Sequence, residues 1–365
     1  MTDVAVVGGG PAGCAAALAL RAHAPGLSVT LLEASSYAEP RIGETLPPPA
    51  AEVLRRLGVW DAFGAQGHRP AYGTAAAWGG AHAHDHDFFG SVHSVGWQLD
   101  RAAFDAMLAS AAEARGVAVR RSTRVTGAER EGGGWRLALD GAPALHARFV
   151  IDATGPSASF ARRQGGARAR VVDRLAGFAR FLREARPTPA GTLVEAFPDG
   201  WWYTAALPGG LRVAVCMTDS DLARPLRLDE ERGWLDALRA APLTSALLDG
   251  AEPCGPPLVR AARTRRLDPP SGDGWLAAGD AASAFDPLSS QGVLKALCSG
   301  IFAAYATGDL LTSGDERGMR RYDHFIRQEF AGYLRARARY YAEERRWPAR
   351  EFWRRRHAPE PAAAP

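Results

Sequence analysis

The sequence is poor in cysteine and almost devoid of lysine, and both shortages exclude classes of protein. The four cysteines, Cys14, Cys216, Cys254 and Cys298, stand far apart in the 365-residue chain, without a C-x-x-C pair. This spacing argues against a disulfide framework and against a zinc ribbon. Lys295 is the only lysine, so arginine supplies the other 43 of the 44 basic side chains.

Long apolar runs are also missing. No stretch approaches the roughly 20 apolar residues that cross a bilayer, and a strand-like run begins at Asp3, which leaves no room for a signal peptide. We therefore expect a cytoplasmic protein with no membrane partner. Hydrophobic residues make up 47% and charged residues 23% of the chain, a globular composition that excludes a wholly disordered or fibrous protein.

Positive charge is concentrated near the C-terminus. Residues 316–356 hold 13 arginines against six acidic residues, an excess of seven, although the whole chain carries only +4. Such a stretch is usually a solvated helix face, and the alternatives are binding of nucleic acid or attraction of an acidic peptide or protein. We expect no nucleic-acid partner.

Two strand patterns alternate along the chain. Continuous apolar runs, typical of parallel strands buried on both faces, occur at 3–7, 27–33, 149–153 and 275–279. A second pattern covers 191–197, 201–207 and 211–218, where Pro198-Asp199-Gly200 and Pro208-Gly209-Gly210 provide turns between the strands of an antiparallel meander.

These patterns predict an α/β fold with two interleaved domains and C-terminal helices. A Rossmann-like dinucleotide-binding domain is expected over 1–70, 96–165 and 271–315, with helices at about 100–115 and 291–311. An antiparallel-sheet substrate domain is expected over 71–95 and 166–270. A helical region follows at 316–357, with an amphipathic helix over 316–346, and 358–365 is expected to be a flexible tail.

The first candidate site is the turn Gly8-Gly9-Gly10-Pro11-Ala12-Gly13, which follows a strand and opens a helix. Its glycines let the backbone approach a pyrophosphate, and the helix N-terminus favours negative charge. Glu33 lies 20 residues past Gly13, at the end of the second strand, where a carboxylate accepts hydrogen bonds from ribose hydroxyls. An acid there disfavours a 2′-phosphate, so FAD or NAD fits better than NADP. The predicted contacts are Gly8, Gly10, Pro11, Ala12, Gly13 and Glu33.

A second motif lies far downstream, in Gly279-Asp280-Ala281-Ala282, Asp286-Pro287 and Ser289-Ser290-Gln291-Gly292. It resembles the second flavin fingerprint of the large FAD-binding superfamily that includes p-hydroxybenzoate hydroxylase, geranylgeranyl reductases and tryptophan halogenases. The resemblance implies FAD, with Asp280 bonded to the ribityl chain and the positive end of the helix that starts near Gln291 aimed at the flavin.

Further segments, Arg41-Ile42-Gly43-Glu44 and Asp100-Arg101, resemble the FAD contacts of that superfamily. The resemblance thus implies these additional cofactor-binding residues: Arg41, Gly43, Arg101, Val125, Gly279, Asp280, Pro287, Gln291, Gly292 and Val293. Only one full G-x-G-x-x-G is present, and the stretch from Asp152 to Arg162 departs from the segment that many NADPH-dependent hydroxylases carry. Reducing equivalents are therefore expected from NAD(P)H, either directly or through a separate flavin reductase.

Two branches of the superfamily compete for the chemistry. Flavin halogenases carry a W-x-W-x-I-P signature and a catalytic lysine in their N-terminal third, whereas here the matching strand is Trp201-Trp202-Tyr203-Thr204-Ala205-Ala206-Leu207-Pro208 and no lysine precedes Lys295. Halogenation is therefore disfavoured. The chain looks closer to a second branch, which contains flavoprotein maturases that hydroxylate tryptophan during quinone-cofactor formation, and peptide-tryptophan monooxygenases. The segments that carry this resemblance are 41–48, 201–203, 286–292 and the tail from Tyr340 to Trp353.

This second resemblance implies an FAD-dependent monooxygenase that hydroxylates an indole, borne on a tryptophan-containing peptide or protein. Reduced flavin and O₂ give a C4a-hydroperoxide, which attacks electron-rich rings. On the substrate side, Trp201, Trp202 and Tyr203 are candidates for an aromatic wall, with core packing as the alternative. Glu44 is a candidate for orienting the indole N–H or acting as a base, with a structural role in the flavin loop as the alternative, and His93 is a weaker candidate.

No metal site is expected, because His82, His84 and His86 fit an exposed edge strand better than a ligand set. Three other functions remain open. The first is a flavin halogenase, and the second is a flavin oxidase or reductase acting at a C–N or C=C bond. The third is a flavin-binding docking partner in a maturation complex that has no catalytic role.

Overall fold

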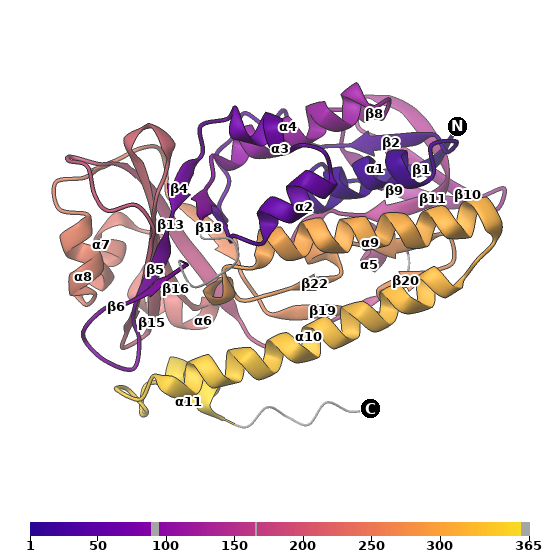
Figure 1. The fold of residues 1–365 in the computed structure, drawn as a ribbon. Helices are drawn as coiled ribbons and strands as arrows, with labels where there is room; N and C mark the ends of the chain where they lie inside the picture. Colours follow the sequence, from indigo (N-terminus) through magenta and orange to yellow (C-terminus); the bar gives the residue numbers. More distant parts are fainter. Residues whose placement is uncertain (89–94, 165, 359–365) are drawn as a thin grey trace. The chain divides into compact units, whose positions relative to one another are not determined.

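The computed structural model of the chain describes residues 1–88, 95–164 and 166–358. It contains two compact units, each assembled from three separate chain segments (Figure 1). Unit 1 comprises Met1–Gly67, Asp100–Val171 and Arg265–Phe330, and unit 2 comprises His68–Leu99, Val172–Thr264 and Ala331–Pro365. The predicted fold class, a parallel-sheet domain interleaved with an antiparallel-sheet domain, is confirmed.

Unit 1 combines a mainly parallel sheet with helices. Its elements are β1 (Thr2–Val7), α1 (Pro11–His23), β2 (Val29–Leu32), β3 (Thr45–Leu46), α2 (Ala50–Arg56), α3 (Trp60–Gly64), α4 (Arg101–Ala114), β8 (Ala118–Arg120), β9 (Val125–Glu131), β10 (Gly134–Leu139), β11 (Ala142–Asp152), α5 (Ser159–Arg163), β12 (Arg168–Val171), β19 (Arg265–Asp268), β20 (Ser271–Gly272), β21 (Trp275–Ala277), β22 (Ser283–Ala284), α9 (Gly292–Ser313) and the start of α10 (Arg317–Glu343).

The main sheet of unit 1 has the strand order β20-β21-β11-β1-β2-β8. β1 lies between β11 and β2 and pairs with both in parallel, so that Val6 stands opposite Ile151 and Leu31. These three side chains are fully buried, as expected for a central parallel strand covered on both faces. The continuous apolar runs of the sequence therefore predicted the right kind of strand.

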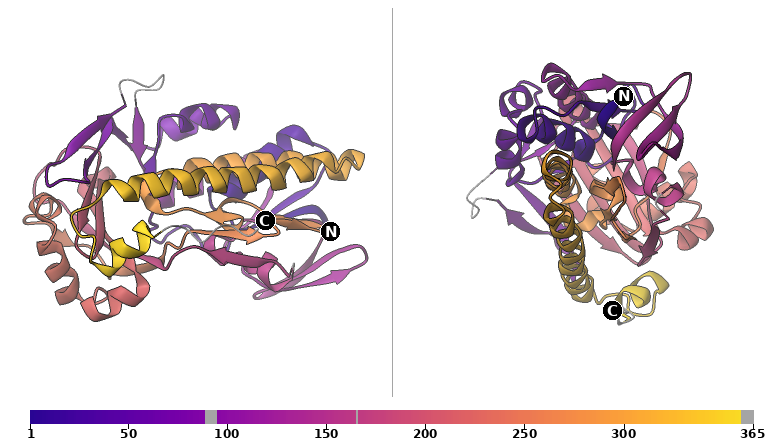
Figure 2. Two further views of the ribbon diagram at one scale, coloured as in Figure 1. Left: turned by 90° about the horizontal axis from the view of Figure 1, so that it is seen from below. Right: turned by 90° about the vertical axis from the view of Figure 1, so that its right-hand side faces the viewer.

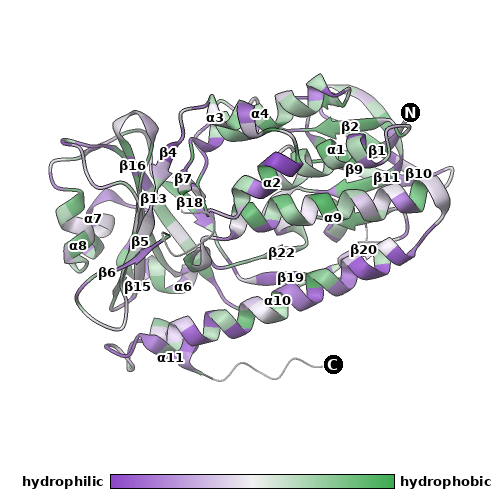
Figure 3. Ribbon diagram, viewed as in Figure 1, coloured by the Kyte–Doolittle hydropathy of each residue, from purple (hydrophilic) through white to green (hydrophobic). Residues whose placement is uncertain are grey.

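Helices α1 and α9 pack on each other inside unit 1 without large side chains between them. A Cβ at Gly300 of α9 would lie 2.2 Å from the backbone oxygen of Ala12 in α1, so only glycine permits this approach. α9 is long and apolar enough to cross a membrane by length and composition, and it is largely green in Figure 3. However, 67% of its most apolar stretch is buried within the structure, as in the core helix of a folded domain.

Unit 2 is built around a mainly antiparallel sheet. Its elements are β4 (Arg69–Ala71), β5 (Gly73–Ala77), β6 (His84–Asp87), β7 (Gly96–Gln98), β13 (Leu175–Arg183), β14 (Thr192–Phe197), β15 (Gly200–Ala206), β16 (Leu211–Asp219), α6 (Ser220–Leu226), α7 (Glu231–Arg239), α8 (Pro242–Leu247), β17 (Glu252–Pro253), β18 (Leu258–Ala261), the end of α10 and α11 (Glu351–His357).

The predicted meander is the centre of that sheet, whose order is β17-β13-β16-β15-β14-β5-β6. β14, β15 and β16 follow one another as antiparallel neighbours, and the turn before β15 depends on Gly200, whose φ is +156° and whose Cβ would lie 2.0 Å from Met217 O. β6 is an exposed edge strand that carries His84 and His86, as the sequence predicted.

One face of the unit 2 sheet packs against α6, α7 and α8. Trp202 of β15 is fully buried in this core, 4.9 Å from the ring of Trp234 in α7 and 6.3 Å from Phe197. Its strand neighbours Trp201 and Tyr203 point to the opposite face, because side chains alternate along a strand. The indole N–H of Trp201 there lies 3.1 Å from the hydroxyl of Tyr341 in α10.

α10 is one continuous helix that contributes to both units, and its course is visible in both views of Figure 2. In unit 1, the hydroxyl of Tyr322 donates to the backbone oxygen of Ala277 over 2.7 Å. In unit 2, Arg337 forms an ion pair of 3.0 Å with Asp173. The sequence predicted this helix with nearly the right bounds, but as part of a separate C-terminal region.

Replacing Trp202 tests the packing role of its indole. Trp202→Ala removes a fully buried ring from the unit 2 core, and we expect the free energy of unfolding to fall by about 3–5 kcal/mol, measured by urea denaturation. The control is Tyr340→Ala, whose side chain is 53% exposed and whose loss should change stability little. Equal losses for the two variants would contradict the assigned core role.

Candidate functional site

The turn between β1 and α1 contains three glycines with different surroundings. Gly8 has a φ of +109°, and a Cβ there would lie 2.3 Å from Ala153 O. A Cβ on Gly13 would lie 1.8 Å from Gly8 O, so this glycine lets α1 pack directly on the turn. A Cβ on Gly10, in contrast, would meet no heavy atom within 4 Å. Protein packing therefore explains the first and third glycines but not the second.

The free space at Gly10 fits a bound dinucleotide. In a G-x-G-x-x-G turn, the second glycine leaves room for the pyrophosphate beside the backbone. No side chain caps the N-terminus of α1, so its first N–H groups and the positive end of its dipole remain available to an anion. The free space and the uncapped helix end fit a pyrophosphate, and its contacts with Gly10, Ala12 and Gly13 stay predictions.

Glu33 follows β2 and holds the glycine turn in place. Its Oε2 accepts the backbone N–H of Gly9 over 2.7 Å, and its Oε1 accepts the N–H and the hydroxyl of Ser35 over 2.9 and 2.5 Å. Arg41 Nη2 lies 3.2 Å from the same Oε1. Oε2 retains acceptor capacity, since a carboxylate oxygen can accept two hydrogen bonds. The contact between Glu33 and the ribose stays a prediction.

A buried carboxylate joins two of the predicted FAD-binding arginines. Asp105 of α4 is fully buried, 2.7 Å from Arg41 Nη1 and 3.2 Å from Arg101 Nη2. Arg101 also donates to the backbone oxygens of Ile42 and Gly43, over 3.1 and 2.8 Å. Asp105 therefore orients both guanidinium groups, and Arg101 fixes the loop that carries Arg41 and Gly43.

One hydroxyl group and one thiol group donate hydrogen bonds to the backbone of the glycine turn. Tyr37 Oη donates to Gly9 O over 2.9 Å, and Cys14 Sγ lies 3.1 Å from the same oxygen. Burial raises the pKa of the Cys14 thiol and of the Tyr37 hydroxyl, so both groups stay protonated and act as donors. Cys14 is therefore a packed structural residue and not a nucleophile.

The second motif is held directly against the first. Gly279 has a φ of +62°, and a Cβ there would lie 2.6 Å from the Cβ of Ala12. Its backbone N–H donates to Ser299 Oγ over 2.6 Å. Asp280 follows, with a side chain that is 39% exposed. The two motifs, which are far apart in sequence, thus meet at Ala12, as one cofactor site requires.

Lys295 is committed to this second motif. Its Nζ lies 2.7 Å from Asp280 Oδ1, donates to the backbone oxygen of Ser283, and sits 4.5 Å from the ring of Phe285. Only 2% of the Lys295 side chain is exposed. The only lysine of the chain therefore pairs with Asp280 and holds its carboxylate in place. The contact between Asp280 and the ribityl chain stays a prediction.

Glu329, in the unit 1 part of α10, is a half-buried acid whose charge interacts with that of Lys295. Burial raises the pKa of Glu329 from its ordinary value of 4.5 to about 7, although Lys295 acts in the opposite direction. Among the described residues, Glu329 Oε2 has no hydrogen-bond partner. The carboxyl group is thus neutral over part of the physiological pH range and changes its charge near neutrality.

The helix that the sequence placed after the second motif is α9, which begins at Gly292. Gln291 occupies its N-cap position without a side-chain cap, and the Asp286 carboxylate accepts the N–H of Leu288 over 3.0 Å in the preceding turn. The first N–H groups of α9 are therefore not satisfied by a side-chain cap. The contacts of Pro287, Gln291, Gly292, Val293 and, at the start of β9, Val125 with a flavin stay predictions.

Asp152, at the end of β11, has a structural role. Its Oδ1 accepts the N–H and the hydroxyl of Thr154 over 3.0 and 2.6 Å, and its Oδ2 accepts the N–H of Ala161 over 2.8 Å. Burial raises the pKa of this carboxyl. The acid thus fixes the chain between β11 and α5, in the segment that departs from the NADPH-dependent pattern.

The predicted substrate-side residues have different environments. Trp202 lies in the hydrophobic core of unit 2, which matches the packing alternative. Trp201 and Tyr203 lie on the other face of the same sheet with their rings 6.1 Å apart, and only 9% of Tyr203 is exposed. Glu44 is a buried residue of unit 1, with 2% exposure, and His93 lies outside the described residues.

The sequence prediction assigned no role in the site to four residues: Tyr37, Asp105, Lys295 and Ser299. Asp105 stands four residues after Arg101 in a helix, a spacing that favours an ion pair and could have signalled its role. Lys295 was conspicuous as the only lysine. Tyr37 and Ser299 carry no comparable signal, because their partners are backbone groups brought together by the fold.

The fold and the paired motifs define a class, the flavoproteins that bind FAD through a Rossmann-like domain. Residues 1–324 match the family described as FAD binding domain, and the chain belongs to this family. It is an FAD-dependent oxidoreductase, as its homologues are oxidoreductases and halogenases. The sequence-based prediction of the superfamily is confirmed.

Three similar proteins extend over nearly the whole chain. The Marinomonas mediterranea protein named "Putative FAD-dependent oxidoreductase LodB" is 31% identical over 363 residues, covering 98% of this chain and 97% of that protein. The flavin-dependent halogenase CmlS is 27% identical with a TM-score of 0.88, covering 99% of this chain and 68% of the other. The peptidyl tryptophan dihydroxylase QhpG is 26% identical with a TM-score of 0.77, covering 97% and 78%.

Gly10→Val tests the dinucleotide cradle. The φ of Gly10 is −75°, so valine does not strain the backbone, and the new side chain enters space that no protein atom occupies. We expect a folded protein that has lost most of its non-covalently bound FAD, measured by flavin absorbance after gel filtration. Gly26→Val is the matched control, because a Cβ at Gly26 also meets nothing within 4 Å but lies outside both motifs. Full flavin occupancy in Gly10→Val would refute the assignment.

Glu329→Gln tests the raised pKa of this half-buried acid. Because the pKa is raised in the folded protein, the folded state binds more protons than the unfolded state between pH 4.5 and about 7. The stability that Glu329 contributes is complete below this window and is lost as the pH rises through it. We expect the thermal midpoint of the parent protein to fall more across this window than that of Glu329→Gln. Parallel curves for the two proteins would show that the acid has no raised pKa.

Proposed function

We propose that the protein is an FAD-dependent monooxygenase that hydroxylates the indole of a tryptophan residue within a peptide or protein. Bound FAD, once reduced, would supply the electrophilic oxygen by reaction with O₂. The reducing equivalents would come from NAD(P)H, either directly or through a separate flavin reductase. The chain itself binds FAD, orients the substrate and excludes water.

The environment of Lys295 is the observation that favours a monooxygenase over a halogenase. A lysine that captures hypohalous acid needs an accessible, nucleophilic amine. Lys295 Nζ is instead paired with Asp280 over 2.7 Å, and 2% of the side chain is exposed. An amine that is buried and donates to a carboxylate and to the backbone oxygen of Ser283 is not accessible to hypohalous acid. The chain contains no second lysine to replace it.

One of the similar proteins supports a polypeptide substrate. QhpG, whose structure matches 97% of this chain, is a peptidyl tryptophan dihydroxylase essential for tryptophylquinone cofactor biogenesis. An electron-rich indole is the kind of ring that an electrophilic oxygen donor attacks. Glu44, a buried carboxyl of unit 1, is our first candidate for holding the indole N–H.

Halogenation is the second candidate function, and the similarity to CmlS favours it, since that enzyme is a flavin-dependent halogenase with the higher TM-score. The two functions share FAD and O₂ but differ in the product. A halogenase requires chloride or bromide and adds a halogen atom, whereas a monooxygenase adds oxygen from O₂ with or without halide.

Mass spectrometry of a tryptophan-containing peptide separates these functions. With the FAD-loaded protein, a flavin reductase, NADH and isotopically labelled O₂, we expect the peptide to gain one or two labelled oxygen atoms on the indole. We expect this product with and without halide, and not from Gly10→Val. A halogenated product would establish the second candidate, and oxygen derived from water would refute the monooxygenase. Turnover of free tryptophan at the same rate as the peptide would refute the proposal that the substrate is a polypeptide.

A further inference from the structure

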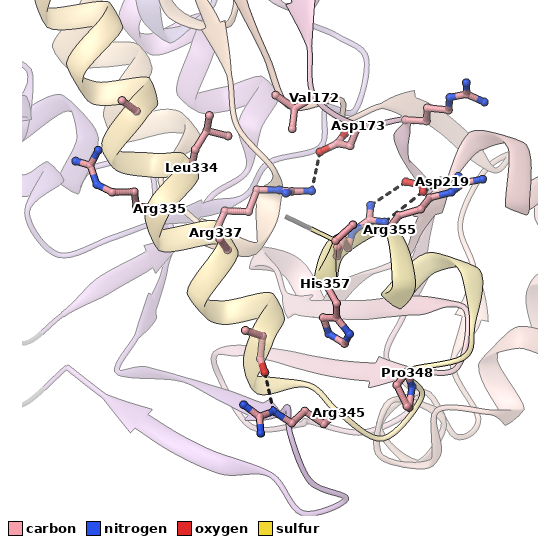
Figure 4. Close-up of a pocket in the computed structure, with 16 residues that line it drawn as sticks. Val172, Asp173, Asp219, Leu334, Arg335, Arg337, Arg345, Pro348, Arg355 and His357 are labelled. Atoms are coloured by element: carbon pink, nitrogen blue, oxygen red, sulfur yellow. Dashed lines mark hydrogen bonds and ion pairs between the residues drawn. The ribbon is translucent and has the colours of Figure 1, made fainter. Parts of the chain in front are cut away.

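A basic groove lies within unit 2, remote in sequence from both flavin motifs. It has a volume of about 1190 Å³ and lies between the C-terminal half of α10, α11 and the segment before β13 (Figure 4). Pockets for drug-sized ligands are usually about 300–1,000 Å³, so this groove is large for a single small molecule.

The walls of the groove carry an excess of positive charge. Six of the lining residues are arginines and two are aspartates, which gives a formal excess of four positive charges. Both aspartates are already neutralised at the floor. Asp173 pairs with Arg337 over 3.0 Å and Asp219 pairs with Arg356 over 2.8 Å, and all four side chains are nearly inaccessible.

The arginines at the rim are not neutralised in this way. Arg335 and Arg345 form no ion pair within the described part of the chain, and Arg345 Nε donates only to the backbone oxygen of Ala342, over 3.2 Å. Arg174 is 68% exposed, and its closest carboxylate oxygen, in Asp221, is 3.6 Å away. Three guanidinium groups from different segments thus border one groove with donors available.

The chemistry of the lining selects among negatively charged partners. Guanidinium groups bind carboxylates through paired hydrogen bonds, and clusters of arginines recognise acidic segments of peptides. Leu334 and Val172 add apolar surface between the charges, which suits a polypeptide. Among the described residues, His357 is the one aromatic ring in the lining, which contains no Phe, Tyr or Trp, whereas single-stranded nucleic acids are usually held by stacking of successive bases on several aromatic rings. The lining therefore favours an acidic peptide over nucleic acid.

We infer that this groove binds an acidic segment of the polypeptide substrate, away from the tryptophan that is modified. The inference rests on the proposed function for the identity of the partner, but the binding itself needs no turnover. The carboxylates of the segment meet Arg174, Arg335 and Arg345, while the floor pairs Arg337–Asp173 and Arg356–Asp219 keep the groove in shape. A second recognition site of this kind raises affinity for a polypeptide over free tryptophan.

Fluorescence anisotropy with a tryptophan-free peptide tests the groove. The probe is a fluorescein-labelled peptide of alternating glutamate and glycine, and the comparison peptide carries glutamine in place of each glutamate. The FAD-loaded protein should bind the glutamate peptide, with an affinity that falls as salt rises. In the double variant Arg335→Glu/Arg345→Glu, the dissociation constant should rise at least about tenfold, because attraction is replaced by repulsion at both sites.

The matched control is Arg320→Glu/Arg321→Glu, which makes the same charge change on the unit 1 part of α10. Both arginines are exposed and lie outside the groove, so we expect a change of less than about twofold. Equal weakening in the two double variants would show a general charge effect and overturn the inference. Equal binding of the glutamine peptide, or displacement of the glutamate peptide by a single-stranded oligonucleotide at lower concentration, would overturn it as well.

The two proposals fail separately. If the glutamate peptide binds as expected but a tryptophan peptide is not oxidised, the inferred peptide-binding groove is supported and the proposed function is refuted. If a tryptophan peptide is oxidised but the glutamate peptide does not bind, the proposed function is supported and the inferred peptide-binding groove is refuted. Intact circular dichroism and FAD content in both double variants exclude misfolding as the cause of lost binding.

Discussion

The cofactor site depends on the close approach of α1 and α9. A Cβ on Gly279 would lie 2.6 Å from the Cβ of Ala12, and a Cβ on Gly300 would lie 2.2 Å from the oxygen of the same residue. A larger residue at Gly300 would push α9 from α1, and one at Gly279 would push the turn that carries Asp280 from α1, because a packed interior has no free volume to absorb it. The same displacement would separate Asp280 from the glycine turn. Small residues at this contact therefore determine whether two distant motifs form one site.

Much of the fold could be predicted because its signals are local. The glycine turn, the apolar run of β1 and the amphipathic pattern of α10 are each read within a few residues, and all three are confirmed. The sequence spacing indicates the ion pair of Asp105 with Arg101, but it does not indicate the second ion pair with Arg41, which is 64 residues away in sequence. The alternation of side chains along a strand likewise predicts that Trp201 and Trp202 lie on opposite faces of the sheet. It does not predict which of the two faces packs against α7.

The sequence could not predict that α10 is divided between the two units, and the reason is related. Its periodicity marks one apolar face along the whole helix, but the pattern is the same whichever unit that face meets. The expectation of a solvated basic face was also incomplete, because Arg337 and Arg356 are buried in ion pairs and Arg356 lies 3.5 Å over the ring of Phe352. Arginine suits such positions, since its planar group pairs and stacks at the same time.

The interleaving of the units constrains the order of events during synthesis. The ribosome delivers β1 and α1 first, but β21 and α9, which complete the sheet and cover α1, follow only after residue 274. The second segment of unit 2 is also made before unit 1 is complete. Nascent chains of this topology expose apolar strand faces until late in translation, a situation in which chaperones bind. Truncated or stalled chains therefore carry an unfinished core in both units, and such fragments are candidates for aggregation and proteolysis.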